Sequence, residues 1–193
     1  MQFDEVVPQR LNGAETFTAA GEATDLGLID YWRWSASNLV SNARRGVLAE
    51  YIMGHAVGAV NGVREEWAPW DLTTPEGIRI EVKSAAFIQS WKQKRPSRIT
   101  FSIKASMSPG QDGEQERVRP SHVYVFALLA HEEQATLNPM NLDQWDFYVV
   151  STPELNEHHA IQSSITLKSL QKLAYRCSWS ALLEKVTRAA TIQ

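Results

Sequence analysis

Residues 70–84 read WDLTTPEGIRIEVKS, a pattern that is typical of a β-hairpin. Within it, residues 74–77 (TPEG) place Pro and Gly at the spacing that favours a tight turn. Residues 78–84 then alternate apolar and charged side chains, which is the period of a β-strand with one buried face. The stretch therefore predicts a strand that is anchored in the core by its apolar face and carries its charges on the other.

The charged face of this strand has two interpretations. Glu81 and Lys83 lie two residues apart, so their side chains project to the same side of the strand. Asp71 lies about as far before the turn as Glu81 lies after it, and cross-strand neighbours approach to ~5 Å. An exposed Glu-x-Lys pair is usually a solvated ion pair worth less than ~1 kcal/mol. With Asp71 opposite, however, two carboxylates, a backbone carbonyl such as that of Val82 and waters would suit Mg²⁺ or Mn²⁺.

A further carboxylate is predicted on a helix upstream of the hairpin. Ser37 or Asn38 can cap a helix that runs to about Val60. Glu50 falls inside the apolar stripe of this helix and should face the protein, where a carboxylate needs a partner. That partner is either a bound metal ion or an arginine such as Arg98. The residues of the predicted stripe are Val40, Ala43, Val47, Tyr51, Gly54 and Val57.

The remaining pattern predicts one α/β domain. Residues 1–34 show no clear period and are interpreted as a loosely structured arm, and residues 35–193 as a single domain. The continuous apolar run 123–129 predicts a central buried strand, and residues 105–120 are rich in turn formers and predict a loop. The resulting fold class is α/β, with a central mixed sheet flanked by helices. Further strands are expected at 63–71, 98–103 and 145–150, and helices at 167–173 and 180–186, with Ser180 as a cap.

Composition restricts the class of protein further. The chain has 193 residues, a net charge of −3 and a single cysteine, Cys177, which excludes an intrachain disulfide and a cysteine-rich zinc site. The N-terminus lacks a signal-peptide pattern, and no apolar run is long enough to span a bilayer. A soluble cytoplasmic protein with no membrane partner is therefore expected.

The charges are unevenly distributed along the chain. Residues 1–34 carry six acids against two bases, whereas residues 79–104 carry seven bases against Glu81 alone. If the substrate is a nucleic acid, this strip is expected to contact phosphates, and a solvated loop is the alternative. Trp91, inside the strip, either stacks on a base or covers the core. The candidate nucleic-acid-binding residues are Lys92, Lys94 and Arg95, with Arg44 and Arg45 at the start of the predicted helix.

The acidic residues and the lysine together resemble the PD-(D/E)XK, or restriction-endonuclease-like, nuclease superfamily. The resemblance rests on Glu50 in LAEY, Asp71 in PWDL and the triplet Glu81-Val82-Lys83, which occur in the order of that family. It covers about residues 37–130 and implies a restriction-endonuclease-like core. By the same resemblance Asp71 and Glu81 would be metal ligands together with the Val82 carbonyl, Lys83 the catalytic lysine, and Glu50 an accessory acid.

The function that follows from the resemblance is metal-dependent hydrolysis of phosphodiester bonds, with Mg²⁺ or Mn²⁺ as the cofactor and DNA as the favoured substrate. The small size of the chain favours weak sequence specificity, or a homodimer or partner subunit that supplies it. The alternative is a catalytically inactive, nuclease-like module that binds nucleic acid or another partner.

Overall fold

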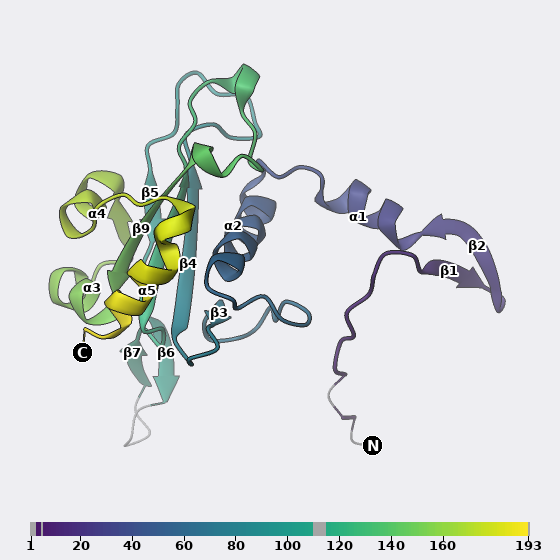
Figure 1. Ribbon diagram of the computed structural model, residues 1–193, viewed down its shortest axis with the longest axis horizontal. Helices are drawn as coiled ribbons and strands as arrows, with labels where there is room; N and C mark the ends of the chain where they lie inside the picture. Colours follow the sequence, from purple (N-terminus) through teal and green to yellow (C-terminus); the bar gives the residue numbers. More distant parts are fainter. Residues whose placement is uncertain (1–2, 5, 110–114, 193) are drawn as a thin grey trace.

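A four-stranded mixed sheet forms the centre of the protein, in the order β3-β4-β8-β9 (Figure 1). The computed structural model describes residues 3–4, 6–109 and 115–192. Strand β4 is antiparallel to β3 and parallel to β8, and β8 is antiparallel to β9. The predicted α/β class with a mixed sheet flanked by helices is confirmed. The strands are β3 (Leu72–Thr73), β4 (Arg79–Ala86), β8 (Val123–Leu129) and β9 (Trp145–Ser151).

Strand β8 is the buried centre of this sheet. Every one of its seven residues is buried, as the apolar run 123–129 predicts. It pairs with β4 from Ile80 opposite Val123 to Ala86 opposite Leu129, so the whole length of β4 is fixed against it. The alternation of β4 then sends Ile80 and Val82 to one face of the sheet and the charged residues to the other. The strand prediction at the hairpin is confirmed, as is the prediction at 145–150.

The two faces of the sheet carry separate cores. One face packs against helices α2 (Asn42–Ala56) and α5 (Leu182–Ala190), and the other against a two-stranded sheet and two helices. Both faces are thus covered, which a partly parallel sheet requires. Among the described helices, none combines the length and the apolar composition that a bilayer span requires. The elements on the second face are β5 (Thr100–Ser102), α3 (Thr152–His159), β10 (Ser164–Thr166) and α4 (Leu167–Leu173).

Helix α2 is shorter than predicted at both ends. Its cap is Ser41, whose Oγ accepts from the Arg44 N–H at 3.4 Å, rather than Ser37 or Asn38. It ends at Ala56, because Gly58 adopts φ +69°, a left-handed conformation that stops a helix.

The predicted strand at 63–71 is wrong. Only Leu72 and Thr73 pair with β4, and residues 57–71 are irregular. Gly62, like Gly58, has positive φ (62°), and Pro69 cannot donate a ladder hydrogen bond, so this segment breaks where a strand would need to continue.

Three other segments differ from their predictions. The supposed loop at 105–120 contains an antiparallel hairpin, β6 (Ser106–Pro109) and β7 (Gln115–Val118). Helix α3 was not predicted. The last helix begins at Leu182 after a 3₁₀ turn, and Ser180 is not its cap, since the cap residue Ala181 has no side-chain hydrogen bond and the Ser180 Oγ contacts Ser178 Oγ instead.

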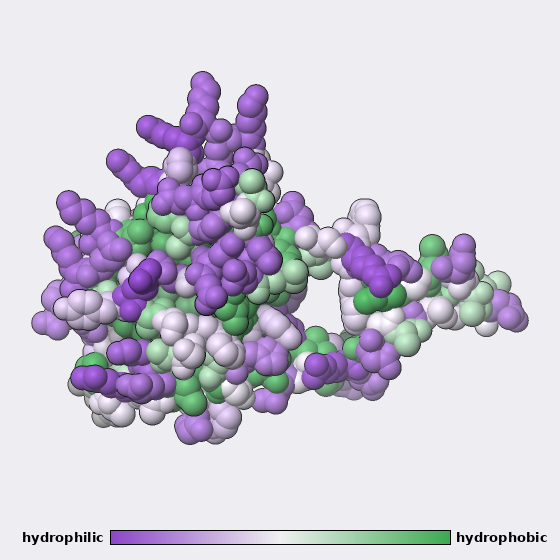
Figure 2. Space-filling model, turned by 45° about the horizontal axis from the view of Figure 1, so that its top comes forward, coloured by the Kyte–Doolittle hydropathy of each residue, from purple (hydrophilic) through white to green (hydrophobic). Residues whose placement is uncertain are grey.

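The N-terminal segment has more order than a loosely structured arm. It forms a hairpin, β1 (Thr16–Ala19) and β2 (Glu22–Gly27), followed by α1 (Leu28–Ala36), and extends away from the body (Figures 1 and 2). Glu15 organises its base, because its carboxylate accepts from the N–H groups of Asn12 and Gly13 at 3.2 and 2.8 Å. These elements could not be predicted from apolar periodicity, because none of the residues of α1 is buried and the segment therefore needs no apolar face.

A buried arginine, Arg119, links the elements that cover the second face of the central sheet. Arg119 donates to the backbone oxygens of Ile103, His159 and Gln162 at 3.0, 2.9 and 3.3 Å, and its Nη1 donates to Asn156 Oδ1. It thereby satisfies the carbonyl of the last residue of α3, which the helix itself leaves without a partner, and one carbonyl beyond the end of α3.

We expect Arg119→Met to lower the free energy of unfolding by about 2–4 kcal/mol, because buried acceptors lose their donor. Arg117→Met, at an exposed position two residues earlier, should change it by less than ~0.5 kcal/mol. Urea unfolding of both variants measures the difference, and equal stabilities would contradict the structural role.

Candidate active site at the open edge of strand β4

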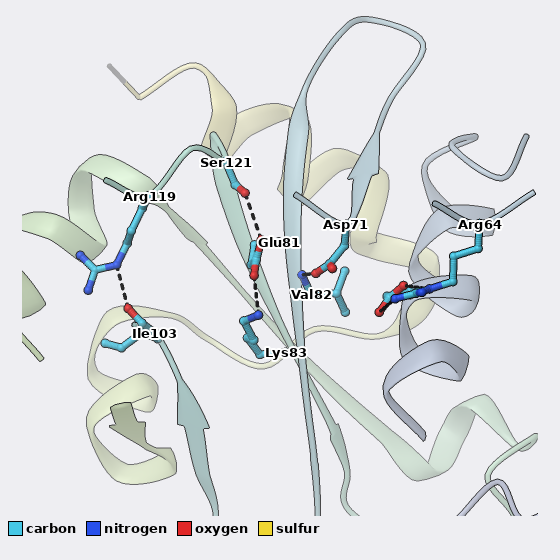
Figure 3. A network of polar contacts seen from close by, with 9 residues as sticks. Arg64, Asp71, Glu81, Val82, Lys83, Ile103, Arg119 and Ser121 are labelled. Atoms are coloured by element: carbon cyan, nitrogen blue, oxygen red, sulfur yellow. Dashed lines mark hydrogen bonds and ion pairs between the residues drawn. The ribbon is translucent and has the colours of Figure 1, made fainter. Parts of the chain in front are cut away.

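Asp71 immediately precedes strand β3, at the point where the edge of β4 becomes free (Figure 3). Its backbone N–H donates to Ile80 O at 3.1 Å, and its carboxylate Oδ2 accepts from the Val82 N–H at 2.7 Å. Strand β3 pairs only with Arg79 and Ile80, so the Asp71 side chain replaces the next rung of the ladder. Because the N–H and C=O of one strand residue point to the same edge, the Val82 carbonyl also faces this free edge.

Glu81 and Lys83 lie on the charged face of β4, as predicted from their spacing (Figure 3). Lys83 Nζ donates to Glu81 Oε1, and Ser121 Oγ lies 3.4 Å from Glu81 Oε2. The two side chains are 29% and 17% exposed, which is well below the exposure of a solvated surface pair. The Glu81–Lys83 pair is therefore half-buried beside the edge that Asp71 occupies.

The Asp71 carboxyl is in an unfavourable electrostatic environment for an acid. Burial raises its pKa to about 6 from the ordinary 3.8, and the carboxylates of Glu81 and Glu50 act in the same direction, against the opposing effects of the Val82 N–H and Lys83. Tyr124 is affected by the same carboxylates. Burial and the charge of Glu81 raise the pKa of Tyr124 to about 12. Asp71 is therefore partly buried at this edge and interacts unfavourably with two further carboxylates.

Glu50 faces the protein from α2, although through a different helix face than predicted. Its side chain is 13% exposed and forms a two-pronged ion pair with Arg64, with Nε–Oε2 and Nη2–Oε1 distances of 2.5 and 2.9 Å. The pair raises the pKa of the Arg64 guanidinium. The arginine partner is thus Arg64 rather than Arg98. The predicted stripe is right only at its C-terminal end, since Gly54 and Val57 are buried whereas Val47 and Tyr51 are exposed. The buried residues of α2 are Arg45, Ala49, Ile52, Met53 and Gly54.

A cleft of about 430 Å³ joins Glu50 and Asp71 on the α2 side of the edge. Arg64 lines it together with the rings of Tyr51 and Trp70. Arg64 and Ser121 contact the candidate acids, and neither was predicted from the sequence. Arg64 stands in an irregular segment next to two glutamates, and Ser121 in a connection before β8, so no periodicity marks them.

The candidate nucleic-acid-binding residues differ in exposure. Arg44, Lys92, Lys94 and Arg95 are exposed, and the last three lie on the loop that follows β4. Arg45 is only 4% exposed, so its prediction as a phosphate-binding residue is wrong. Its guanidinium instead donates to protein oxygens at the start of α2, because the helix turns this residue toward the core.

The oxygen atoms available at this edge suit a cation that needs few protein ligands. No group of three or more His, Cys, Asp and Glu side chains is arranged around a common point in the described part of the chain. Mg²⁺ does not need one, since it binds through one or two carboxylates and keeps several waters. Asp71, Glu81 and the Val82 carbonyl, which faces the same free edge, fit that requirement, and burial together with the neighbouring carboxylates raises the pKa of Asp71.

The fold and this edge together define a class: an α/β protein with acids and a lysine gathered at the end of a short hairpin. The family model of bacteriophage T4 endonuclease IV matches residues 30–169, more than half of the chain. The chain belongs to this family and is therefore a nuclease. The matched segment contains every residue of the candidate site and of the basic loop. A search of curated proteins finds no match.

We expect Asp71→Asn to stabilise the metal-free protein at about pH 7.5. The amide keeps an oxygen for the Val82 N–H but removes the charge that burial and Glu81 disfavour. Because the folded-state pKa of Asp71 is raised, the contribution of Asp71 to the stability of the wild type should fall as the pH rises from about 4 to about 7. The variant should gain about 1–3 kcal/mol over the wild type across this window.

Chemical denaturation in EDTA over this pH range measures the effect. Asp25→Asn, at an exposed position in β2, is the control and should follow the wild type. A stability difference between Asp71→Asn and the wild type that does not grow as the pH rises through this window would contradict the placement of Asp71.

Proposed function

We propose that the chain is a metal-dependent endonuclease that hydrolyses phosphodiester bonds in DNA on a PD-(D/E)XK, restriction-endonuclease-like core. The observation that carries the proposal is the convergence of Asp71 with the Glu81–Lys83 pair at the free edge of β4. Family membership supports the nuclease activity, and the chain order of Glu50, Asp71, Glu81 and Lys83 supports the superfamily.

Asp71, Glu81 and the Val82 carbonyl would hold a Mg²⁺ or Mn²⁺ ion. When bound, such an ion lowers the pKa of a water molecule and offsets charge on the phosphoryl oxygens. The protein's own contribution is to keep both carboxylates in place. The Val82 N–H donates to the Asp71 carboxylate, and Ser121 Oγ lies 3.4 Å from Glu81 Oε2. Each acid is therefore oriented by a contact with another residue of the protein.

Lys83 would act on the substrate rather than only on Glu81. The Lys83 side chain is 29% exposed and its ammonium group donates to Glu81, so a phosphate at the edge of β4 would be within its reach. There it would orient the attacking water and stabilise negative charge that develops on the phosphate.

Glu50 would serve as an accessory acid. Its ion pair with Arg64 holds it beside Asp71, with which it interacts electrostatically. A role as a direct metal ligand would require Glu50 to exchange Arg64 for the ion. We therefore propose the pair as a positioning element, and ligation by Glu50 only for a site that binds two metal ions.

The exposed cations would contact the DNA backbone. Lys92, Lys94 and Arg95 follow the catalytic strand directly, and Arg44 lies at the start of α2. Arg45 is not included, because it is buried. Cutting both strands of a duplex symmetrically would call for a homodimer or a partner subunit. A cytoplasmic location without membrane attachment accords with this function.

A nuclease-like module without turnover is the second candidate. It is favoured only by the ion pairs that occupy Glu50 and Glu81, since these acids could be structural. It predicts binding of nucleic acid without cleavage, whatever the metal.

We expect the wild type to cleave plasmid or single-stranded DNA with Mg²⁺ or Mn²⁺ and not with EDTA. Lys83→Ala and Glu81→Ala should each lower the rate at least ~10²–10³-fold, because charge stabilisation at the reacting phosphate is lost. Lys168→Ala, which removes an exposed charge from α4, is the control and should cleave normally.

Gel-based cleavage assays on folded proteins measure these rates. Full activity of Lys83→Ala would contradict the catalytic lysine. Metal-independent cleavage would contradict the cofactor, and binding without cleavage by the wild type would favour the second candidate.

A further inference from the structure

The loop between β4 and β5 is closed at its base by the backbone. The Ser97 N–H donates to Phe87 O at 2.9 Å, so residues 87–97 leave and return to the body at one point. The loop lies at the end of β4 that follows the candidate site (Figure 1). In Figure 2, long hydrophilic side chains stand out from this end of the body.

Two glutamines fill the inside of this loop with hydrogen bonds. Gln93 Oε1 accepts from the Gln89 N–H at 2.7 Å, and Gln93 Nε2 donates to Phe87 O and Ser97 Oγ at 3.2 and 3.0 Å. Gln89 Nε2 donates to Ala86 O and Ser97 Oγ at 2.8 and 3.2 Å. Gln89, Gln93 and Ser97, spaced four residues apart, all take part in this inner network. The loop therefore has a polar interior that fixes its shape.

Arg45 connects this interior to helix α2. Its guanidinium donates to Gln89 Oε1 at 3.3 Å, to Val40 O at 3.1 Å and to Asn42 Oδ1 at 2.8 Å. No carboxylate pairs with it in the described part of the chain, and burial lowers its pKa. A buried guanidinium without a counterion is costly. What it provides is a fixed attachment of the loop to the body.

The outer surface of the loop carries free positive charge. Lys92, Lys94 and Arg95 are exposed, and none forms an ion pair within the residues that the structure describes. Trp91 is 54% exposed, so it is not a lid over the core. Residues 91–98 also line a shallow hollow on this surface. The glutamine side chains thus bond inside the loop, whereas the side chains of Trp91, Lys92, Lys94 and Arg95 are exposed on its outer surface.

We infer that residues 87–97 form a pre-organised binding loop for the DNA backbone, held in shape by Gln89, Gln93 and Arg45. This inference rests on the proposed nuclease function. Lys92 and Lys94 contact phosphates, and Trp91 packs against a sugar or base. Because the polar interior orders the loop before binding, the substrate does not have to order it. Gln93 and Arg45 are positioning residues that never touch DNA.

The position of the loop predicts which part of the substrate it contacts. Phe87 follows Lys83 by four residues, or ~13 Å at ~3.3 Å per residue of extended chain. We place the DNA strand along β4; because a stacked strand advances ~3.4 Å per nucleotide, the loop then contacts it about four nucleotides or more from the scissile phosphate. Shorter oligonucleotides should not reach it.

The test uses Gln93→Ala, which removes the inner hydrogen bonds that the Gln93 side chain makes, without changing any charge. We expect KM for long oligonucleotides to rise about 10-fold, with kcat and the Mg²⁺ requirement unchanged. The slope of log affinity against log salt should become shallower by ~0.7–0.9 for each phosphate that the loop no longer binds. Gln171→Ala, which removes a side-chain hydrogen bond between α4 and Tyr148, is the matched control and should bind as the wild type does.

Substrate length separates a binding role from a merely structural one. With fewer than about four nucleotides on either side of the scissile phosphate, Gln93→Ala and wild type should have the same KM. Lys92→Ala/Lys94→Ala should show the same length dependence as Gln93→Ala. Equal KM values for Gln93→Ala and wild type on long substrates would overturn the inference, as would an equal loss on short ones.

The choice of readout also separates this inference from the proposed function. Fluorescence anisotropy in Ca²⁺ or EDTA measures DNA binding without cleavage. Loss of affinity in Gln93→Ala would support the loop even if the wild type proved to be catalytically inactive. Cleavage by the wild type with unaltered binding by Gln93→Ala would reject the loop and leave the nuclease intact.

Discussion

The difference in length between β3 and β4 is the constraint on which the site depends. Strand β3 has two residues and β4 has eight. Beyond Ile80, one edge of β4 therefore has no hydrogen-bonded strand beside it among the described residues. The Asp71 carboxylate takes the place of the missing strand at Val82. On its other edge β4 is held along its whole length by the buried strand β8. The free edge is therefore rigid, and acids placed on it keep their positions.

This fixed geometry holds carboxylates at separations where their negative charges repel one another. Asp71 interacts with both Glu81 and Glu50, while the available cations are already engaged, Lys83 with Glu81 and Arg64 with Glu50. A fold selected for stability alone would separate these charges or replace them. Retaining a destabilised acid at the end of a hairpin is typical of a functional site. It accords with membership of the bacteriophage T4 endonuclease IV family.

The parts of the structure that repeat with a clear period could be predicted from sequence. The alternation at Glu81 and Lys83 and the apolar run of β8 set the sheet and the charged face, because few other arrangements bury those residues. The partner of Glu50 could not be predicted, since Arg64 reaches it from an irregular segment. The burial of Arg45 could not be predicted either, because a charged residue at a helix start is usually solvated, whereas here Gln89 and the α2 backbone provide acceptors for it.

The central claim is that Asp71 and Glu81 are held together to receive a divalent cation, and thermal unfolding with added Mg²⁺ or Mn²⁺ tests it most directly. A ligand that binds only the folded state stabilises it by ~2.7 kcal/mol at 100 times its Kd. We predict a midpoint that rises with metal concentration for the wild type and stays constant for Asp71→Asn. An equal rise in both proteins, or no rise in either, would contradict the claim.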